Sequence, residues 1–201
     1  MKSAMPYHGL TSPELRALVR PLLADPGLRV TDRGAWEEAV RELWDGATHR
    51  EERYAAIAFT GHRAYRAWQD VDTLPLYRHL VVTGAWWDLA DEVAGGRVGP
   101  ILLADPARAT PVVLGWATDD DLWLRRTAVL SQLSFRDRTD TALLRACIEA
   151  NLADPSFWLR KAIGWALRQY ARTDPDWVRA TVQQWDDRLS PLSRREALKH
   201  L

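Results

Sequence analysis

Proline follows a helix-capping side chain at five places, and this pattern restricts the fold more than any other feature of the sequence. The pairs are Ser12-Pro13, Asp105-Pro106, Asp154-Pro155, Asp174-Pro175 and Ser190-Pro191. Ser and Asp are favoured at the residue before a helix, and Pro at the first helical position. Apolar residues between the pairs follow the 3.6-residue period, whereas alternating strand-like runs bounded by Asn-Gly or Asp-Gly turns are absent. We therefore expect an all-α protein in which each pair starts a helix.

Two seven-residue segments repeat at a spacing of 35 positions, WLRRTAV from Trp123 and WLRKAIG from Trp158. Arg195, in the segment SRREAL, follows Lys161 after a further 34 positions. A period in the mid-thirties to forties, built from helix pairs, is typical of HEAT-like repeats. We therefore expect residues 1–201 to form one domain, a right-handed solenoid of antiparallel helix pairs with a concave face.

The net charge is zero, but the basic residues are unevenly distributed. From Leu122 onward there are 14 Lys and Arg against 9 Asp and Glu, and 24 of the chain's 27 basic residues are Arg, the better phosphate ligand. Arg126, Lys161 and Arg195 recur at one position per repeat, which in a solenoid aligns them along one face. Most surface arginines are merely solvated, yet an aligned basic stripe on the concave face is typical of a protein that binds a polyanion.

Other composition features exclude several classes of protein. No apolar run approaches the roughly 18 residues of a membrane span, and no secretory signal opens the chain, so we expect a cytoplasmic protein. Cys147 lies in a helical apolar pattern, which favours a buried thiol. The histidines show no ligand spacing, so we expect neither a metal nor a cofactor. They are His8, His49, His62, His79 and His200.

Eleven tryptophans are several times the ordinary number, and most are expected to pack in the core. Trp36, Trp44, Trp68, Trp116, Trp177 and Trp185 are assigned only that role. Trp165 differs, because its helical neighbours at i−4 and i+3 are Lys161 and Arg168, whereas the apolar stripe runs through other positions. An indole between two cations favours contact with a planar or electron-poor ligand beside a phosphate chain.

The segment GAWWDLAD contains a second unusual pair of tryptophans. Trp86 and Trp87 are adjacent, so on a helix they point about 100° apart and only one of them is expected to face the core. Trp87 precedes Asp91 by one helical turn, which places an indole and a carboxylate on one surface. Most aspartates on helices merely face solvent, and the spacing alone favours that interpretation of Asp91 over a catalytic carboxylate.

Four ordered segments resemble the AlkD-type DNA alkylation repair enzymes, which are alkylpurine DNA glycosylases built from HEAT-like repeats. They are VVTGAWWDLADEVAG, DDLWLRRTAVLSQL, SFWLRKAIGWALRQYA and LSPLSRREALKHL. The resemblance implies that Trp87, Asp91 and Trp165 surround the damaged nucleotide. It also implies that Arg126, Lys161 and Arg168 contact the DNA backbone. Family members begin with a further helical segment, so the resemblance implies that this segment is missing or truncated here.

The resemblance implies a monomeric, monofunctional glycosylase of the bacterial cytoplasm, acting on double-stranded DNA that contains alkylated bases. Its substrates would be positively charged N3- or N7-alkylated purines, hydrolysed without deep base flipping. No lysine is placed as a Schiff-base nucleophile, since Lys2, Lys161 and Lys199 are the only ones. A non-catalytic HEAT-like protein that recognises damaged or branched DNA is the alternative. A protein–protein scaffold is a third reading, which the spacing of the basic residues disfavours.

Overall fold

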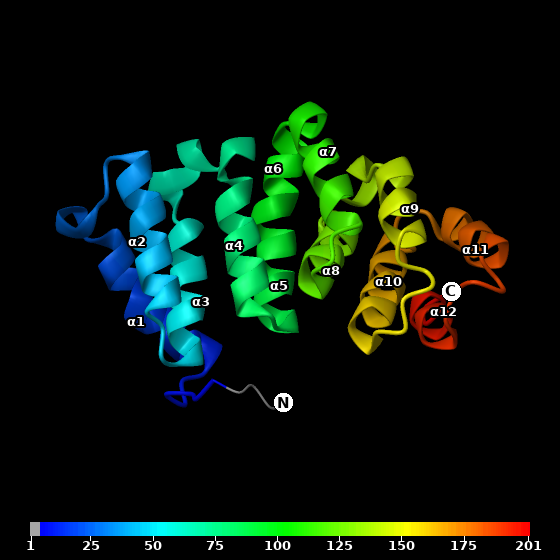
Figure 1. Ribbon diagram of the computed structural model, residues 1–201, viewed down its shortest axis with the longest axis horizontal. Coiled ribbons are helices and arrows are strands. Elements are labelled where there is room, and N and C mark those ends of the chain that lie inside the picture. Colours follow the sequence, from blue (N-terminus) through cyan, green and yellow to red (C-terminus); the bar gives the residue numbers. More distant parts are fainter. Residues whose placement is uncertain (1–4) are drawn as a thin grey trace. The chain divides into compact units, whose positions relative to one another are not determined.

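The computed structural model describes residues 5–201, and within that range it contains helices and no strands (Figure 1). The expectation of an all-α protein is therefore confirmed. The helices form two compact units, of which the first ends at Leu80 and the second runs from Val81 to Leu201. No helix in the described range is long and apolar enough to cross a membrane.

The first unit is built around two helices that pack on each other, α2 (Arg33–Asp45) and α3 (Arg50–Thr60). Its other elements are α1 (Ser12–Ala24), η1 (Pro26–Leu28), η2 (Arg63–Trp68), η3 (Val71–Thr73) and the first part of α4 (Leu74–Gly84). The boundary between the units falls within α4, after Leu80. Trp36 and Trp44 of α2 are fully buried, and the Trp36 ring contacts Tyr65 and Trp68. Indole packing therefore forms much of this core.

The second unit arranges its helices in two rows (Figure 1). The first row holds α5 (Trp87–Val93), α8 (Leu122–Leu130), α10 (Phe157–Tyr170) and α12 (Pro191–Ala197), and each packs on the next. The second row holds α7 (Pro106–Ala117), α9 (Thr141–Glu149) and α11 (Pro175–Gln184), which pack against the first row. The remaining elements are η4 (Ala94–Val98), α6 (Gly99–Ala104) and η5 (Arg136–Arg138). The repeated WLR segments therefore lie on neighbouring helices, α8 and α10, as a solenoid-like repeat requires.

Three of the five expected helix starts are found as predicted. The capping carboxylates or hydroxyls of Asp105, Asp174 and Ser190 each accept a hydrogen bond from the backbone N–H three residues later. In each case proline occupies the first helical position. These caps begin α7, α11 and α12, and they satisfy N–H groups that have no partner within the helix.

The other two starts differ from the prediction. The cap of α1 is Thr11, one residue earlier than expected, and its N–H donates to the Glu14 carboxylate at 2.7 Å. Helix α10 begins at Phe157 and is capped by Ser156, not by Asp154. The Asp154 carboxylate is engaged elsewhere, because it accepts the Ser156 N–H at 2.7 Å and pairs with Arg125 at 3.0 Å.

Most tryptophans assigned to the core are buried. Trp36, Trp44, Trp116 and Trp185 are buried, whereas Trp68 and Trp177 are half-buried against neighbouring tyrosines. Cys147 is also buried as expected, and burial raises the pKa of its thiol to about 12. A thiol with that pKa is inert at neutral pH, so Cys147 has a packing role.

Gly164 allows α12 to lie against α10. A Cβ at this position would lie 2.5 Å from the Glu196 Cβ and 2.9 Å from the Ser193 carbonyl oxygen. We expect Gly164→Ala to lower the free energy of unfolding by about 1–3 kcal/mol, because the helices must separate to admit the methyl group. Denaturant titration measures this. As a control, Gly115→Ala on α7 meets no atom within 4 Å and should stabilise the protein by about 0.5–1 kcal/mol. Equal effects of the two variants would contradict the packing.

Candidate active site

Asp91 of α5 and Arg126 of α8 form a two-point ion pair. Arg126 Nε donates to Asp91 Oδ1 at 2.7 Å, and Arg126 Nη2 donates to Asp91 Oδ2 at 2.8 Å. The two residues are 35 positions apart, which is the repeat period found in the sequence. The planar guanidinium matches both carboxylate oxygens, so it fixes the orientation of the carboxylate as well as its position.

The pair lies largely out of solvent. The side chain of Asp91 is 12% exposed and that of Arg126 is 5% exposed. Burial raises the pKa of the Asp91 carboxyl, whereas the hydrogen bonds and charge of Arg126 act in the opposite direction. Arginine does not lose its proton in proteins, so its bidentate contact favours the ionised carboxylate. The Asp91 carboxylate therefore has a fixed orientation and a small solvent-accessible area.

Trp87 occupies the first turn of α5, one turn before Asp91, and is half-buried. Its indole N–H is buried and makes no hydrogen bond within the described residues. The indole is therefore held by packing and not by a hydrogen bond from its ring nitrogen. The placement of Trp87 beside Asp91 agrees with the spacing that the sequence shows.

The helix that carries Asp91 continues into a π-helical turn, η4. Pro100 has no N–H, so the carbonyl of Gly96 lacks its usual partner four residues later. The guanidinium of Arg97 donates to this carbonyl at 2.7 Å instead. Single π-helical turns are frequent at functional sites because they redirect the residues around them.

Three indoles form a cluster that was not predicted from the sequence. The rings of Trp86, Trp123 and Trp158 contact one another with centroid distances of 5.7–6.3 Å. The Trp158 carbonyl also accepts a hydrogen bond from Arg126 Nη1 at 2.5 Å. One guanidinium thus connects α5, α8 and α10. The recurrence of tryptophan at the start of the two WLR segments was the signal for this cluster.

The environment of Arg126 differs from the one that the sequence predicts. The repeat predicted a basic side chain on an exposed stripe, available to phosphate. In the structure the residue is buried, and its three guanidinium nitrogens donate to Asp91 and to the Trp158 carbonyl. The carboxylate that pairs with Arg126 lies one repeat earlier, and the period of the basic residues does not indicate that pairing.

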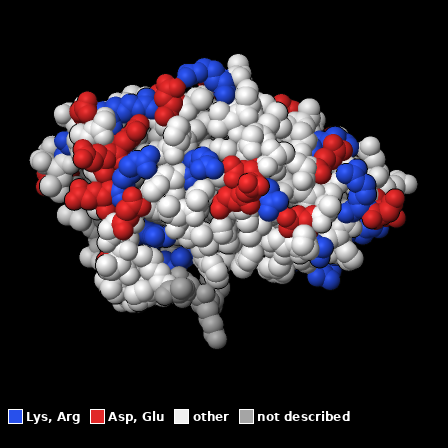
Figure 2. Space-filling model, in the orientation of Figure 1, with Lys and Arg blue, Asp and Glu red and all other residues white. Residues whose placement is uncertain are grey.

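Lys161 and Arg168 are also paired with a carboxylate. Lys161 Nζ lies 2.9 Å from Glu196 Oε1, and Arg168 Nη1 lies 2.5 Å from Glu196 Oε2. The hydrogen bond from Lys161, with the charges of both cations, holds the pKa of Glu196 below its ordinary value. On the face shown in Figure 2, basic and acidic side chains likewise lie beside one another over the last helices of the second unit. Lys161 and Arg168 therefore join α10 to α12, whereas Arg195, the next basic residue of the repeat, is exposed.

Trp165 lies on α10 between Lys161 and Arg168 and is half-buried. It lines an open groove of about 540 Å³ together with Gln169 and the connection between α8 and α9. The residues contributed by that connection are Leu133, Ser134, Phe135, Arg136, Asp137 and Arg138. Neither Trp87 nor Asp91 lines this groove. Asp91 and Arg126 are in contact and Trp87 lies one helical turn before Asp91, whereas Trp165 lies beside the loop that carries Arg136 and Arg138.

Arg136 and Arg138 are functional candidates that the sequence reasoning missed. Both are exposed, and neither pairs with a carboxylate in the part of the chain that the structure describes. Arg136 has a φ of 57°, in the left-handed region that side chains rarely adopt. Such strain often marks a functional loop. The signal in the sequence was the pair of arginines in FRDRTD, between two helical segments.

Comparison with known proteins identifies relatives of the chain. The model of a family described as DNA alkylation repair enzyme matches residues 1–201. Among solved structures, a predicted DNA alkylation repair enzyme from Enterococcus faecalis is similar, with 27% sequence identity and a TM-score of 0.86. The match covers 98% of this chain and 89% of that one. No curated protein matches significantly.

Proposed function

We propose that this chain, which belongs to the family of DNA alkylation repair enzymes, hydrolyses the N-glycosidic bond of positively charged N3- or N7-alkylated purines in double-stranded DNA. The observation that carries this proposal is the oriented Asp91 carboxylate, held by Arg126 beside the indole of Trp87. The products would be a free base and an intact abasic strand.

The chemistry of the lesion suits a site without a general acid. Alkylation at N3 or N7 makes the base a cation and a good leaving group, so it needs no protonation. As the bond breaks, positive charge develops on the deoxyribose, as in other glycoside hydrolyses. A carboxylate about 4 Å away stabilises that charge by roughly 4 kcal/mol at an effective dielectric near 20. Asp91 takes this role, and it also orients the attacking water.

Arg126 acts in this proposal as a positioning residue. Its charge offsets part of the field of Asp91, but its two hydrogen bonds keep the carboxylate ionised in a site where burial favours the protonated form. The third hydrogen bond, to the Trp158 carbonyl, ties the pair to the next helix of the row. A fixed carboxylate requires less reorganisation in the transition state than a mobile one.

The two half-buried indoles supply aromatic faces to the substrate. Trp87 faces the sugar and the cationic base, and Trp165 contacts the nucleotide from the neighbouring groove. Each cation–π contact contributes about 0.5–2 kcal/mol, and the contribution grows as positive charge grows. The groove beside Trp165 is open to solvent and does not enclose a base, which supports hydrolysis without deep base flipping.

A non-catalytic DNA-binding protein is the alternative function. Binding of DNA needs no carboxylate, because DNA phosphates repel a negative charge. The buried guanidinium of Arg126 fixes the orientation of the Asp91 carboxylate, and an oriented carboxylate favours a catalytic role. Lys161 is paired with Glu196, Lys199 is exposed at the end of the chain, and Lys2 lies outside the described residues. We therefore propose a monofunctional enzyme that forms no Schiff base.

Release of free base tests the proposal. The purified chain is incubated with duplex DNA that contains 7-methylguanine or 3-methyladenine, and the released base is measured against a reaction without protein. We expect release well above the spontaneous rate, with the strand cleaved only after treatment with alkali. Release at the spontaneous rate, accompanied by tight binding, would support the alternative function.

Phosphate contacts in the proposed complex come mainly from Arg136 and Arg138, with Lys161 as a third contact because its side chain is 39% exposed. We expect the double variant Arg136→Ala, Arg138→Ala to bind DNA more weakly. The slope of log K against log salt should fall by about 1.8, since each phosphate contact contributes about 0.9. Binding measured at several salt concentrations gives the slope. Arg179→Ala, an exposed arginine of α11 paired with Asp176, is the control and should leave the slope unchanged.

A further inference from the structure

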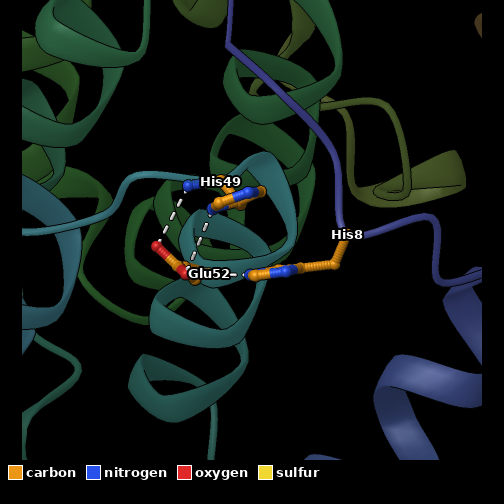
Figure 3. A group of neighbouring side chains, drawn as sticks. All are labelled: His8, His49 and Glu52. Carbon is orange, nitrogen blue, oxygen red and sulfur yellow. Dashed lines mark hydrogen bonds and ion pairs between the residues drawn. The ribbon is translucent and has the colours of Figure 1, made fainter.

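His8, His49 and Glu52 converge in the first unit, far from the residues discussed above in sequence (Figure 3). His8 Nε2 lies 2.9 Å from Glu52 Oε1, and His49 Nδ1 lies 3.7 Å from the same oxygen. The ligand atoms of the three side chains lie within 4.8 Å of one another. His8 and Glu52 are 44 positions apart, so the spacing of the histidines in the sequence does not indicate this cluster.

The backbone around His8 is firmly attached to the start of α3. Glu51, which is 3% exposed, accepts the N–H groups of His8, Gly9 and Leu10 at 3.0–3.1 Å. The Arg50 N–H donates to the Pro6 carbonyl at 2.9 Å. Burial acts to raise the pKa of Glu51, but these backbone hydrogen bonds outweigh it and lower that pKa. The main chain therefore holds His8 in place whether or not its ring has a partner.

The two oxygens of Glu52 have different tasks. Oε2 accepts the backbone N–H groups of Thr48 and His49 at 2.6 and 3.0 Å, as the acidic residue of a capping box does. Oε1 points to the two imidazole rings (Figure 3). One oxygen of Glu52 therefore takes part in the helix cap, and the other faces the imidazole nitrogens.

We propose that His8, His49 and Glu52 form a binding site for a divalent transition-metal ion of the zinc class. Two imidazole nitrogens and one carboxylate oxygen are ligands that Zn²⁺ prefers, and sites with three protein ligands complete their coordination with water. Ligand atoms about 2.0–2.2 Å from a tetrahedral ion lie roughly 3.3 Å apart. The distances of 2.9 and 3.7 Å to Glu52 Oε1 bracket that separation.

Binding requires a local rotation of the two rings. They are stacked at present, with centroids 3.8 Å apart and an angle of 15° between their planes. Each ring must turn so that its nitrogen lone pair points to the ion; the side chains of His8 and His49 are 44% and 33% exposed. The Thr48 hydroxyl lies 2.9 Å from His49 Nδ1 and also contacts the Glu52 carboxylate at 3.3 Å, so it keeps a hydrogen-bond partner when His49 turns.

Metal binding would join the amino-terminal segment to α3. His8 lies on the extended segment before α1, whereas His49 and Glu52 lie at the start of α3. An ion that binds only the folded arrangement stabilises it by mass action. The site is therefore structural, and it is independent of the glycosylase chemistry proposed above.

Isothermal titration of the untagged, metal-free chain with ZnCl₂ tests the site. We expect one ion per chain and a rise in Tm when zinc is added. His8→Phe keeps a planar ring to stack on His49 but has no nitrogen, and His49→Asn keeps a residue that caps helices well. Each variant should bind zinc at least tenfold more weakly, with an unchanged circular dichroism spectrum.

His200→Ala is the matched control, because it removes an exposed histidine of the second unit. It should bind zinc as the wild type does. The proposal is overturned if the wild type binds no zinc, or if His8→Phe and the wild type bind it with equal affinity and stoichiometry. In either case the three side chains form only a hydrogen-bonded cluster that fastens the amino-terminal segment.

Discussion

Replacement of Asp91 by asparagine is expected to lower the rate of base release on the order of a thousandfold, while DNA affinity changes little. The neutral amide is nearly isosteric and still accepts one hydrogen bond from Arg126, so the site keeps its shape. It loses the attraction of roughly 4 kcal/mol between the carboxylate and the developing sugar cation. That loss corresponds to about three orders of magnitude in rate. Single-turnover release of 7-methylguanine, with binding measured separately, separates the two effects.

Glu92→Gln is the matched control for this variant. Glu92 is the next residue on α5 and is exposed, so its replacement removes the same charge from the same helix. It should keep nearly full activity. If both variants lose activity equally, the loss results from the change in local charge and not from a specific role of Asp91.

The dependence of the rate on pH gives a second measurement. Burial raises the pKa of Asp91 in the folded protein above its ordinary value of 3.8. The active form is the ionised one, so the wild-type rate should fall as the pH decreases through that raised pKa. The residual rate of Asp91→Asn should not show this transition. An equal acid transition in both proteins would assign it to another group.

The fold could be predicted from the sequence because its signals are local. Capping residues, proline at the first helical position and the 3.6-residue period depend on neighbours within one turn, and three of the five expected caps are found in place. The failure at Asp154 has a specific cause. Its carboxylate pairs with Arg125, which is distant in sequence, and the nearby Ser156 hydroxyl supplies the cap.

The candidate site could be predicted only in part, because its residues interact between repeats. The position of Trp87 one helical turn before Asp91 follows from their spacing in the sequence. The burial of Arg126 does not, since it depends on Asp91 and on the Trp158 carbonyl 32 positions later. Arg136 and Arg138 lie on a loop, and a loop lacks the regular residue period from which the direction of a helical side chain can be predicted. The same limit concealed the cluster of His8, His49 and Glu52.

Arg126→Ala is the second variant with a large expected effect, and the effect should be on stability. Removing one partner of a buried ion pair leaves the other charge without compensation, which typically lowers the free energy of unfolding by about 3–5 kcal/mol. Asp91 would keep its burial but lose both hydrogen bonds from the guanidinium. The Tm should fall by roughly 6–20 °C for a chain of this size. Arg138→Ala, on the exposed loop, should change stability by no more than about 0.5 kcal/mol.

A double-mutant cycle with Asp91→Ala distinguishes this positioning role from the phosphate contact that the sequence suggested. If the two residues act as one unit, the double variant should be more stable than the sum of the single losses implies, with a coupling energy of about 0.5–3 kcal/mol. A phosphate contact makes a different prediction, in which Arg126→Ala is nearly as stable as the wild type and its salt slope for DNA binding falls by about 0.9. The buried guanidinium, bonded to Asp91 on one side and to the Trp158 carbonyl on the other, has no face turned to phosphate. Its salt slope should therefore equal that of the wild type.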